Sequence, residues 1–329
     1  MTKIRAGLIG FGAMGRNHAR IMRSLESVDF VGAYDPVHTG GNDKESLVFN
    51  SINELISAKP DFCAIATPTI SHEAVAIELI KADISVLIEK PLAIDSSSAK
   101  NILVEFEKKN LYGAVGHIER FNSAVINAKK LINEGLIGDI VQISTTRVGP
   151  FPTRISDVGV VLDLATHDID LVQFLTSSKF KTITAHTMQT RLEGKEDLVV
   201  VVGLLSSGVL VNQIINWVTP KKKRQVIILG TKGTLEINTL NSELVHAAHG
   251  SFKNNFTEVA HINGFNPGHQ SEIAFEVEEP LQREYVEFLK GLRGEQSSSV
   301  SLNEALEIVS VAESILDSSN RRTTVEIDF

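Results

Sequence analysis

Three glycines near the start of the chain restrict its possible folds most. Gly10, Gly12 and Gly15 lie in "GFGAMG", between the apolar segment 4–10 and a helix-like segment at 16–25. Glycines at this spacing between a strand and a helix permit a tight turn and let the backbone approach a pyrophosphate closely. Asp35 ends the next strand-like segment, about 20 residues after the last glycine, where a carboxylate can accept hydrogen bonds from a ribose. We therefore predict a dinucleotide-binding site formed by these residues: Gly10, Phe11, Gly12, Ala13, Met14, Gly15 and Asp35.

Strand-like and helix-like segments alternate through residues 4–120, and the strands are almost continuously apolar. This pattern predicts an α/β Rossmann domain at residues 1–120, with a doubly wound parallel sheet covered on both faces. After residue 121 several strand-like segments follow one another, between 140 and 238. We expect an α+β domain at residues 121–329, with a mainly antiparallel open sheet. No assignment is made for residues 241–276.

Composition and charge exclude several classes of protein. The chain has 329 residues and a net charge of -8, so it lacks the basic surface of a general nucleic-acid-binding protein. Its one cysteine, Cys63, rules out an intramolecular disulfide and a thiolate metal cluster. Residues 198–218 are uncharged and long enough to span a membrane, but Ser206, Ser207 and Gly208 indicate a turn, so a β-hairpin is expected there. We expect a cytoplasmic protein with no membrane or nucleic-acid partner.

The residues after Asp35 indicate the form of the dinucleotide. Pro36, Val37 and His38 provide no arginine or lysine for the 2′-phosphate of NADP, and the carboxylate of Asp35 would repel that phosphate. The expected cofactor is therefore NAD.

Two further motifs carry polar side chains inside apolar segments. Glu89 and Lys90, in "EKP", end the predicted strand 84–90, and carboxyl ends of parallel strands face the ligand crevice. Asp163 and His167 lie four residues apart in "LDLATHDID", which places them on one face of a helix. Such a pair can exchange protons near neutral pH. It can equally be a satisfied core histidine, a stacked surface pair or part of a metal site, although no third ligand is evident and no metal is expected.

Taken together and in order, four segments resemble the glucose–fructose oxidoreductase, inositol dehydrogenase and MocA family: "GLIGFGAMGRNHAR", "ATPTISHEAV", "IEKPLA" and "LDLATHDID". The resemblance implies NAD-dependent oxidation of a sugar or polyol hydroxyl. It also implies that residues 121–329 form the domain that binds the substrate and makes oligomer contacts through its open sheet. It implies that His167 takes the hydroxyl proton, that Asp163 orients His167, and that Lys90 hydrogen-bonds the same oxygen. It also implies a cofactor-binding set that continues beyond the glycine turn: Thr67, Pro68, Thr69, His72, Glu89, Lys90 and His117.

Within that family, "GHIERFNSAV" and "RVGPFPTRISDVGVVLDLATHDID" look most like members that oxidise UDP-N-acetylglucosamine at its 3-hydroxyl. Arg120, Arg147 and Arg154 suit a diphosphate and, with Lys90 and His167, make up the expected substrate site. Ordinary ion pairing at a domain interface is the alternative for these arginines. Inositol or another free sugar remains an alternative substrate, and a non-catalytic NAD-bound regulator an alternative function.

Two other features concern surfaces. Residues 221–224, "KKKR", separate two strand-like segments, which indicates a solvated turn or, alternatively, a contact with an anionic ligand or another subunit. Residues 198–205 and 209–218 are apolar at nearly every position, so both faces of their sheet need cover. Because the sequence provides few helices for this, we expect a homodimer or homotetramer.

Overall fold

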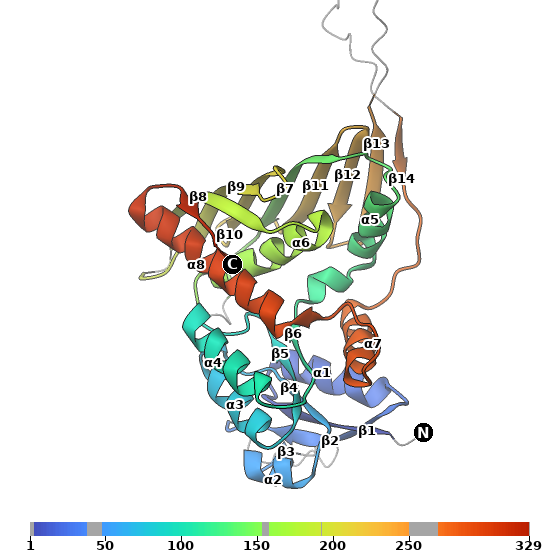
Figure 1. Ribbon diagram of the computed structural model, residues 1–329, viewed down its shortest axis with the longest axis vertical. Coiled ribbons are helices and arrows are strands. Elements are labelled where there is room, and N and C mark those ends of the chain that lie inside the picture. The colour runs from blue at the N-terminus through green and yellow to red at the C-terminus, as the bar shows by residue number, and fades with distance from the viewer. Residues whose placement is uncertain (1–2, 38–47, 153–157, 192, 250–268, 329) are drawn as a thin grey trace, which may run out of the picture.

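The computed structural model describes residues 3–37, 48–152, 158–191, 193–249 and 269–328. The chain forms two β-sheets, one above the other in Figure 1, with helices packed on each. One sheet is almost entirely parallel and the other mainly antiparallel, which confirms the predicted fold class.

The first sheet has seven strands in the order β15-β6-β5-β4-β1-β2-β3. Its pairs are parallel apart from the edge pair of β15 with β6. The strands are β1 (Ile4–Ile9), β2 (Val28–Tyr34), β3 (Val48–Phe49), β4 (Phe62–Ile65), β5 (Ser85–Glu89), β6 (Gly113–Gly116) and β15 (Val300–Ser301). The helices of this half are α1 (Ala13–Ser24), α2 (Ile52–Ser57), α3 (His72–Lys81) and α4 (Ser96–Glu107), with short 3-10 turns η1 (Thr69–Ser71) and η2 (Ile118–Phe121).

The parallel register brings the functional loops together. The strands β1, β4 and β5 are neighbours, with Ile9 paired to Ile65 and Ile65 paired to Ile88. All three of these side chains are buried. Since the strands end at the same edge, the loops that follow them meet there, and they carry the glycine turn, Thr67 and Lys90.

The second sheet has nine strands in the order β14-β13-β12-β11-β7-β10-β9-β8-β16, and its one parallel pair is β10 with β7. The strands are β7 (Ile140–Val148), β8 (Phe180–Met188), β9 (Leu198–Leu205), β10 (Leu210–Asn216), β11 (Lys223–Gly230), β12 (Gly233–Asn238), β13 (Glu243–Ala248), β14 (Gln270–Glu272) and β16 (Val325–Glu326). The expected hairpin at 198–218 is confirmed, because β9 and β10 pair antiparallel across a short turn. No helix in the described parts of the chain is long and apolar enough to cross a membrane.

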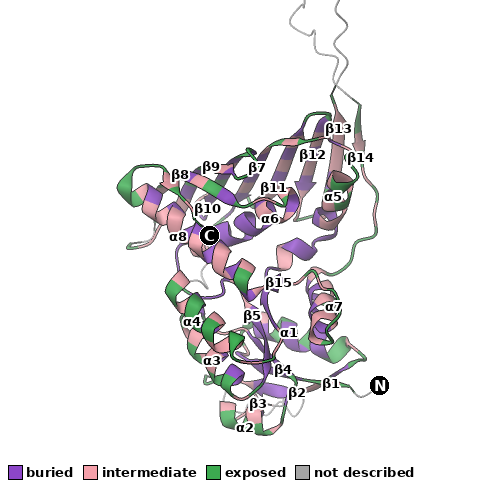
Figure 2. Cartoon of the chain, viewed as in Figure 1, coloured by how far each residue is buried: buried purple, intermediate pink, exposed green. Residues whose placement is uncertain are grey.

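Helices cover one face of the second sheet, called here the inner face. They are α5 (Ser123–Asn133), α6 (Thr166–Thr176) with the π-helical turn η3 (Val161–Ala165) before it, and α8 (Leu302–Arg321). On the opposite, outer face, Val200, Val202, Leu210 and Ile214 are between 41% and 56% exposed. Figure 2 shows buried and more exposed residues alternating along these strands, as expected for a sheet covered on one side.

The C-terminal part of the chain joins the two halves. Helix α7 (Pro280–Leu292) packs against α1 and η2, next to the first sheet. Strand β15 then pairs with β6, with Val300 opposite Val115. Helix α8 leaves this sheet edge and packs against β8 of the second sheet (Figure 1). The first sheet thus includes residues far beyond position 120.

Candidate active site

The glycine turn has the shape that a pyrophosphate requires. Gly10 has a φ of +91°, and a Cβ there would lie 2.6 Å from the carbonyl oxygen of Ala66. A Cβ on Gly15 would lie 2.0 Å from the carbonyl oxygen of Gly10, whereas the space beside Gly12 is open. Gly12 is the N-cap of α1 and provides no side-chain cap, so the first amide groups of this helix can bind a phosphate. The residues therefore fit a dinucleotide.

Asp35 fixes the end of β2 against this turn. Its Oδ2 accepts a hydrogen bond of 2.6 Å from the amide of Phe11, and its Oδ1 accepts one of 2.8 Å from the amide of Val37. A carboxylate accepts up to about four hydrogen bonds, so both contacts are compatible with a ribose hydroxyl as a further donor. His38 lies outside the described residues.

Lys90 connects the two halves of the molecule. It follows β5, and its Nζ donates to Oδ1 of Asp163 at 2.8 Å and to the carbonyl oxygen of Asp163 at 2.7 Å. Asp163 belongs to η3 of the second domain, and both side chains are mostly buried. The carboxylate expected to orient His167 is thus engaged with the lysine in this structure.

His167 lies in the first turn of α6 and is buried. Its Nδ1 has no hydrogen-bond partner among the described residues. The pKa of His167 lies well below its ordinary value, chiefly because the ring is buried and also because Lys90 and Arg147 add positive charge nearby. His117 packs edge-on against it with 6.5 Å between ring centroids, and burial lowers the pKa of His117 to about 4. The site therefore holds two neutral imidazoles beside a cationic amine.

The backbone before α6 is not the regular helix that the four-residue spacing suggested. Residues Val161–Ala165 form a π-helical turn, and α6 begins at Thr166. A π-turn adds a residue to a helical turn and often occurs at functional sites. The change in helix type falls between Asp163 and His167. Their side chains are therefore not stacked one turn apart on a regular α-helix.

Glu89 contacts the backbone of Lys90 and connects it to His18 of α1. Its Oε2 accepts a hydrogen bond from the amide of Lys90 at 3.2 Å, and its Oε1 lies 2.8 Å from Nε2 of His18. The Nδ1 of His18 lies 2.8 Å from the hydroxyl of Tyr285 in α7. Burial alone would raise the pKa of Glu89, but the hydrogen bond and charge of His18 and the charge of Lys90 outweigh it and lower that pKa. His18 and Tyr285 were not predicted from the sequence, in which they are only a histidine in "GRNHAR" and an aromatic residue in a helix-like segment.

The segment after β4 is held against the loop that follows β5. The ring nitrogens of His72 lie 3.0 Å from the carbonyl oxygen of Thr67 and 2.9 Å from that of Pro91. Thr69 is also buried, while Pro68 is exposed. The hydroxyl of Thr67 is buried without a hydrogen-bond partner in the described chain, which makes it the member of this segment best placed to contact a cofactor.

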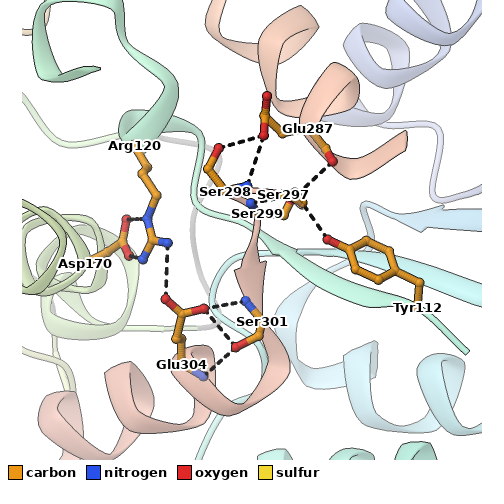
Figure 3. Close-up of polar contacts among 9 residues, drawn as sticks. All are labelled: Tyr112, Arg120, Asp170, Glu287, Ser297, Ser298, Ser299, Ser301 and Glu304. Carbon is orange, nitrogen blue, oxygen red and sulfur yellow. Dashed lines mark hydrogen bonds and ion pairs between the residues drawn. The ribbon is translucent and has the colours of Figure 1, made fainter. Parts of the chain in front are cut away.

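The expected substrate arginines have internal partners. Arg120 forms ion pairs with Asp170 and Glu304, and Figure 3 shows its guanidinium between them. Arg147 binds Asp168 through Nε at 2.7 Å and Glu119 through Nη1 at 2.8 Å. Both arginines are buried, so these contacts match the alternative of ion pairing and leave the diphosphate role without support.

The remaining substrate candidate, Arg154, lies outside the described residues. Within the described ranges, no group of three or more histidine, cysteine, aspartate or glutamate side chains is arranged to hold a metal ion.

Curated proteins include several relatives of this chain. UDP-N-acetylglucosamine 3-dehydrogenase from Acidithiobacillus ferrooxidans is 27% identical over 248 residues, which cover 74% of this chain and 77% of that protein. Glucose-6-phosphate 3-dehydrogenase from Bacillus subtilis (strain 168) is 31% identical over 242 residues, which cover 65% of this chain and 67% of that protein. Among solved structures, levoglucosan dehydrogenase in complex with NADH and L-sorbose superposes over all of both chains, with a TM-score of 0.86 at 20% identity.

Two family models match successive parts of the chain. Residues 4–117 match the oxidoreductase family with an NAD-binding Rossmann fold, and residues 125–236 match the GFO/IDH/MocA C-terminal domain. The first match spans the glycine turn and Lys90, and the second spans Asp163 and His167. This protein therefore belongs to the GFO/IDH/MocA family of oxidoreductases with an NAD-binding Rossmann domain.

Proposed function

We propose that this protein is an NAD-dependent dehydrogenase that oxidises a sugar hydroxyl to a ketone. The observation that carries the proposal is the meeting of the two domains at Lys90, whose Nζ lies 2.8 Å from Oδ1 of Asp163. The neutral His167 follows four residues later, and the turn that fits a dinucleotide lies at the same sheet edge as Lys90. The two relatives compared above are both named as 3-dehydrogenases of sugars, which agrees with this chemistry.

Each catalytic group has a physical role in this proposal. His167, neutral because its pKa is lowered, takes the proton from the substrate hydroxyl. The amine of Lys90 stabilises the negative charge that develops on the same oxygen. Asp163 holds that amine in place through its carboxylate and its carbonyl oxygen, so it acts on Lys90 rather than on His167. When bound, the nicotinamide supplies the acceptor for the hydride that leaves the carbon.

We assign NAD rather than NADP as the cofactor, on the basis of Asp35. Its carboxylate is held at the end of β2 by two backbone amides. In this position it suits a ribose diol and repels a 2′-phosphate. The cofactor would be held by the glycine turn, Asp35 and Thr67, and by His117 and Lys90 at the site's centre.

For the substrate, we propose UDP-N-acetylglucosamine, oxidised at its 3-hydroxyl to a 3-keto sugar. The similarity to the Acidithiobacillus ferrooxidans enzyme of that name supports this choice. A nucleotide also offers binding energy far from the reacting carbon, which can hold the sugar in place for reaction.

The decisive experiment incubates the protein with NAD and UDP-N-acetylglucosamine. We expect NADH to appear and the sugar nucleotide to lose two hydrogen atoms by mass spectrometry. The Lys90→Met variant serves as the control for enzyme-dependent turnover. If UDP-N-acetylglucosamine is inert while myo-inositol or a free sugar is oxidised, the dehydrogenase assignment holds and the substrate is wrong. If no sugar or polyol reduces NAD, the protein is a binding protein and the proposed activity fails.

A further inference from the structure

Two arginines lie side by side on the inner face of the second sheet. Arg224 of β11 is directly opposite Arg147 of β7 in their antiparallel register. Directly opposed residues in such a pair place their side chains on one face, with Cβ atoms about 4.5–5.5 Å apart. Since Arg147 contacts Asp168 of α6, the side chain of Arg224 also starts from the face that α6 covers. Like charges in this position repel each other unless anions compensate them.

The two arginines differ in how their charges are compensated. Arg147 is buried and binds two carboxylates. Arg224 donates through Nη1 to the carbonyl oxygens of Val148, at 2.8 Å, and Lys223, at 3.0 Å. Within the described residues it forms no ion pair, and its Nε and Nη2 donate to no protein group. Its side chain is half-buried, and these two nitrogens are not among the fully buried, unpartnered polar atoms of the described residues, so solvent can reach them.

Arg224 also lies within electrostatic range of the proposed catalytic groups. Its positive charge contributes to lowering the pKa of His167, after burial, Lys90, Arg147 and His117. The pKa of Arg224 falls to about 10 because burial and Arg147 outweigh the attraction of three carboxylates: Asp168, Glu119 and Asp163. The guanidinium is therefore charged at neutral pH, and its charge acts on Asp163 and His167.

We infer that Arg224 is the residue that recognises an anionic group, a phosphate or a carboxylate, on the sugar substrate. This inference rests on the proposed dehydrogenase function and narrows its substrate class to anionic sugars. The Nε and Nη2 atoms form the edge of a guanidinium that binds two oxygens of one anion. The exposed Lys221 and Lys222 just before β11 add positive potential on the approach.

This role belongs to Arg224 rather than to the arginines that the sequence favoured. Arg120 and Arg147 are already neutralised by carboxylates and are at most 7% exposed. An anion that approached either of them would have to displace a buried ion pair, which is strongly unfavourable. At Arg224 the same anion would replace water and relieve the repulsion from Arg147.

The test compares pairs of substrates that differ in charge. Three pairs are used: UDP-N-acetylglucosamine with N-acetylglucosamine, glucose 6-phosphate with glucose, and glucuronate with glucose. Each pair is assayed with the wild type and with Arg224→Met, Arg224→Lys and Lys223→Met.

We expect the wild type to prefer the anionic substrate in at least one pair. In Arg224→Met, kcat/KM for that substrate should fall by about tenfold to a hundredfold, as expected for a lost hydrogen bond to a charged group. The kcat/KM for the neutral partner should fall by a much smaller factor, and Arg224→Lys should restore part of the loss. The control Lys223→Met removes a neighbouring exposed charge and should have little effect.

Binding measurements separate this inference from the proposed activity. Titration calorimetry of the NADH-loaded protein uses UDP, glucose 6-phosphate and glucuronate as probes. The inference predicts that at least one probe binds, and that Arg224→Met weakens it by about tenfold or more while Lys223→Met does not. It is overturned if no probe binds, if both variants bind equally well, or if anionic and neutral sugars lose the same turnover in Arg224→Met. Failure of every sugar to reduce NAD would instead overturn the dehydrogenase proposal, while the calorimetry still decides the role of Arg224.

Discussion

Both faces of the second sheet carry residues that are exceptions to a simple inside–outside rule. The inner face, covered by α6, carries polar side chains that are fully buried, among them Thr145, Arg147 and Gln213. The outer face carries apolar side chains that are substantially exposed, such as Val202 and Leu210. Burying a charge is costly unless it is paired, and exposing an apolar patch is unusual for a surface with no partner. From this difference we expect the inner face to support the reaction and the outer face to support assembly.

The largest effect is expected from breaking a buried ion pair of the inner face. Arg147→Met leaves Asp168, which is 1% exposed, without its cationic partner. Removal of one member of a buried pair costs about 3–5 kcal/mol of unfolding free energy, because the remaining charge is buried and uncompensated. Urea unfolding followed by circular dichroism measures this. The matched control is Arg321→Met, which breaks an exposed pair with Asp317 and should cost less than about 1 kcal/mol. Equal losses in the two variants would contradict the structural role of Arg147.

The next largest effect concerns the reaction itself. Lys90→Met and His167→Ala should each lower turnover by about a hundredfold or more, within the usual range for general acid–base groups. Cofactor affinity, measured by NADH fluorescence, should change much less, because the glycine turn and Asp35 are intact. Near-normal turnover in either variant with the true substrate would mean that the role assigned to that residue is wrong.

The pH dependence tests the same site without a mutation. A general base must be neutral, and an unperturbed histidine is half-protonated near pH 6.5. Since the pKa of His167 is well below that value, the wild-type rate should not fall as the pH is lowered from 8 through 6.5 to 6. A rate that halves near pH 6.5 would point to a solvated base other than His167, provided that the unfolding temperature is constant over this range.

A smaller effect is expected on cofactor choice. Asp35→Asn should lower the preference for NAD over NADP by about tenfold, since two like charges 4 Å apart repel with about 1–4 kcal/mol near a protein surface. The amide keeps an oxygen that can accept from Phe11. Asp29→Asn, an exposed change at the other end of β2, is the matched control and should leave the preference unchanged. A wild type that uses NADP as efficiently as NAD would refute the role of Asp35.

Local chemistry made part of this molecule predictable. The turn at Gly10–Gly15 and the alternation of strands and helices up to residue 120 are determined by residues close together in the sequence. Both were predicted, and both are present in the structure. The long-range pairs were not predictable from spacing. Lys90 and Asp163 are 73 residues apart, and no rule about a four-residue interval reveals that Asp163 binds a lysine from the other domain.

Other elements were missed because tertiary packing alone defines them. Strand β15 is two residues long and exists because β6 offers an edge. The π-turn at Val161–Ala165 has no distinctive composition. Part of residues 241–276 forms β13 and β14, which pair with each other, while 250–268 lie outside the described residues. In the "KKKR" segment, Lys221 and Lys222 form the exposed connection that was predicted, and Arg224 lies in the strand-like segment expected after it, whereas Lys223 already belongs to β11. The inward direction of Arg224 follows only from the register of β11 with β7.

Substitutions on the outer face should have the smallest effect on catalysis and a clear effect on assembly. We expect the wild type to be a homodimer or homotetramer, because Val202 of β9 and Ile214 of β10 are exposed on adjacent strands and an apolar patch of this kind gains free energy when a second copy covers it. The double variant Val202→Lys/Ile214→Glu places charges in that interface, so light scattering at micromolar concentration should report a monomer. Both side chains already face solvent in a single chain, and they lie on the opposite face of the sheet from His167, so turnover should change less than about twofold. The control Leu240→Lys, an exposed change in the turn after β12, should keep the wild-type mass. A wild type that is itself monomeric would refute the assignment of the outer face to assembly.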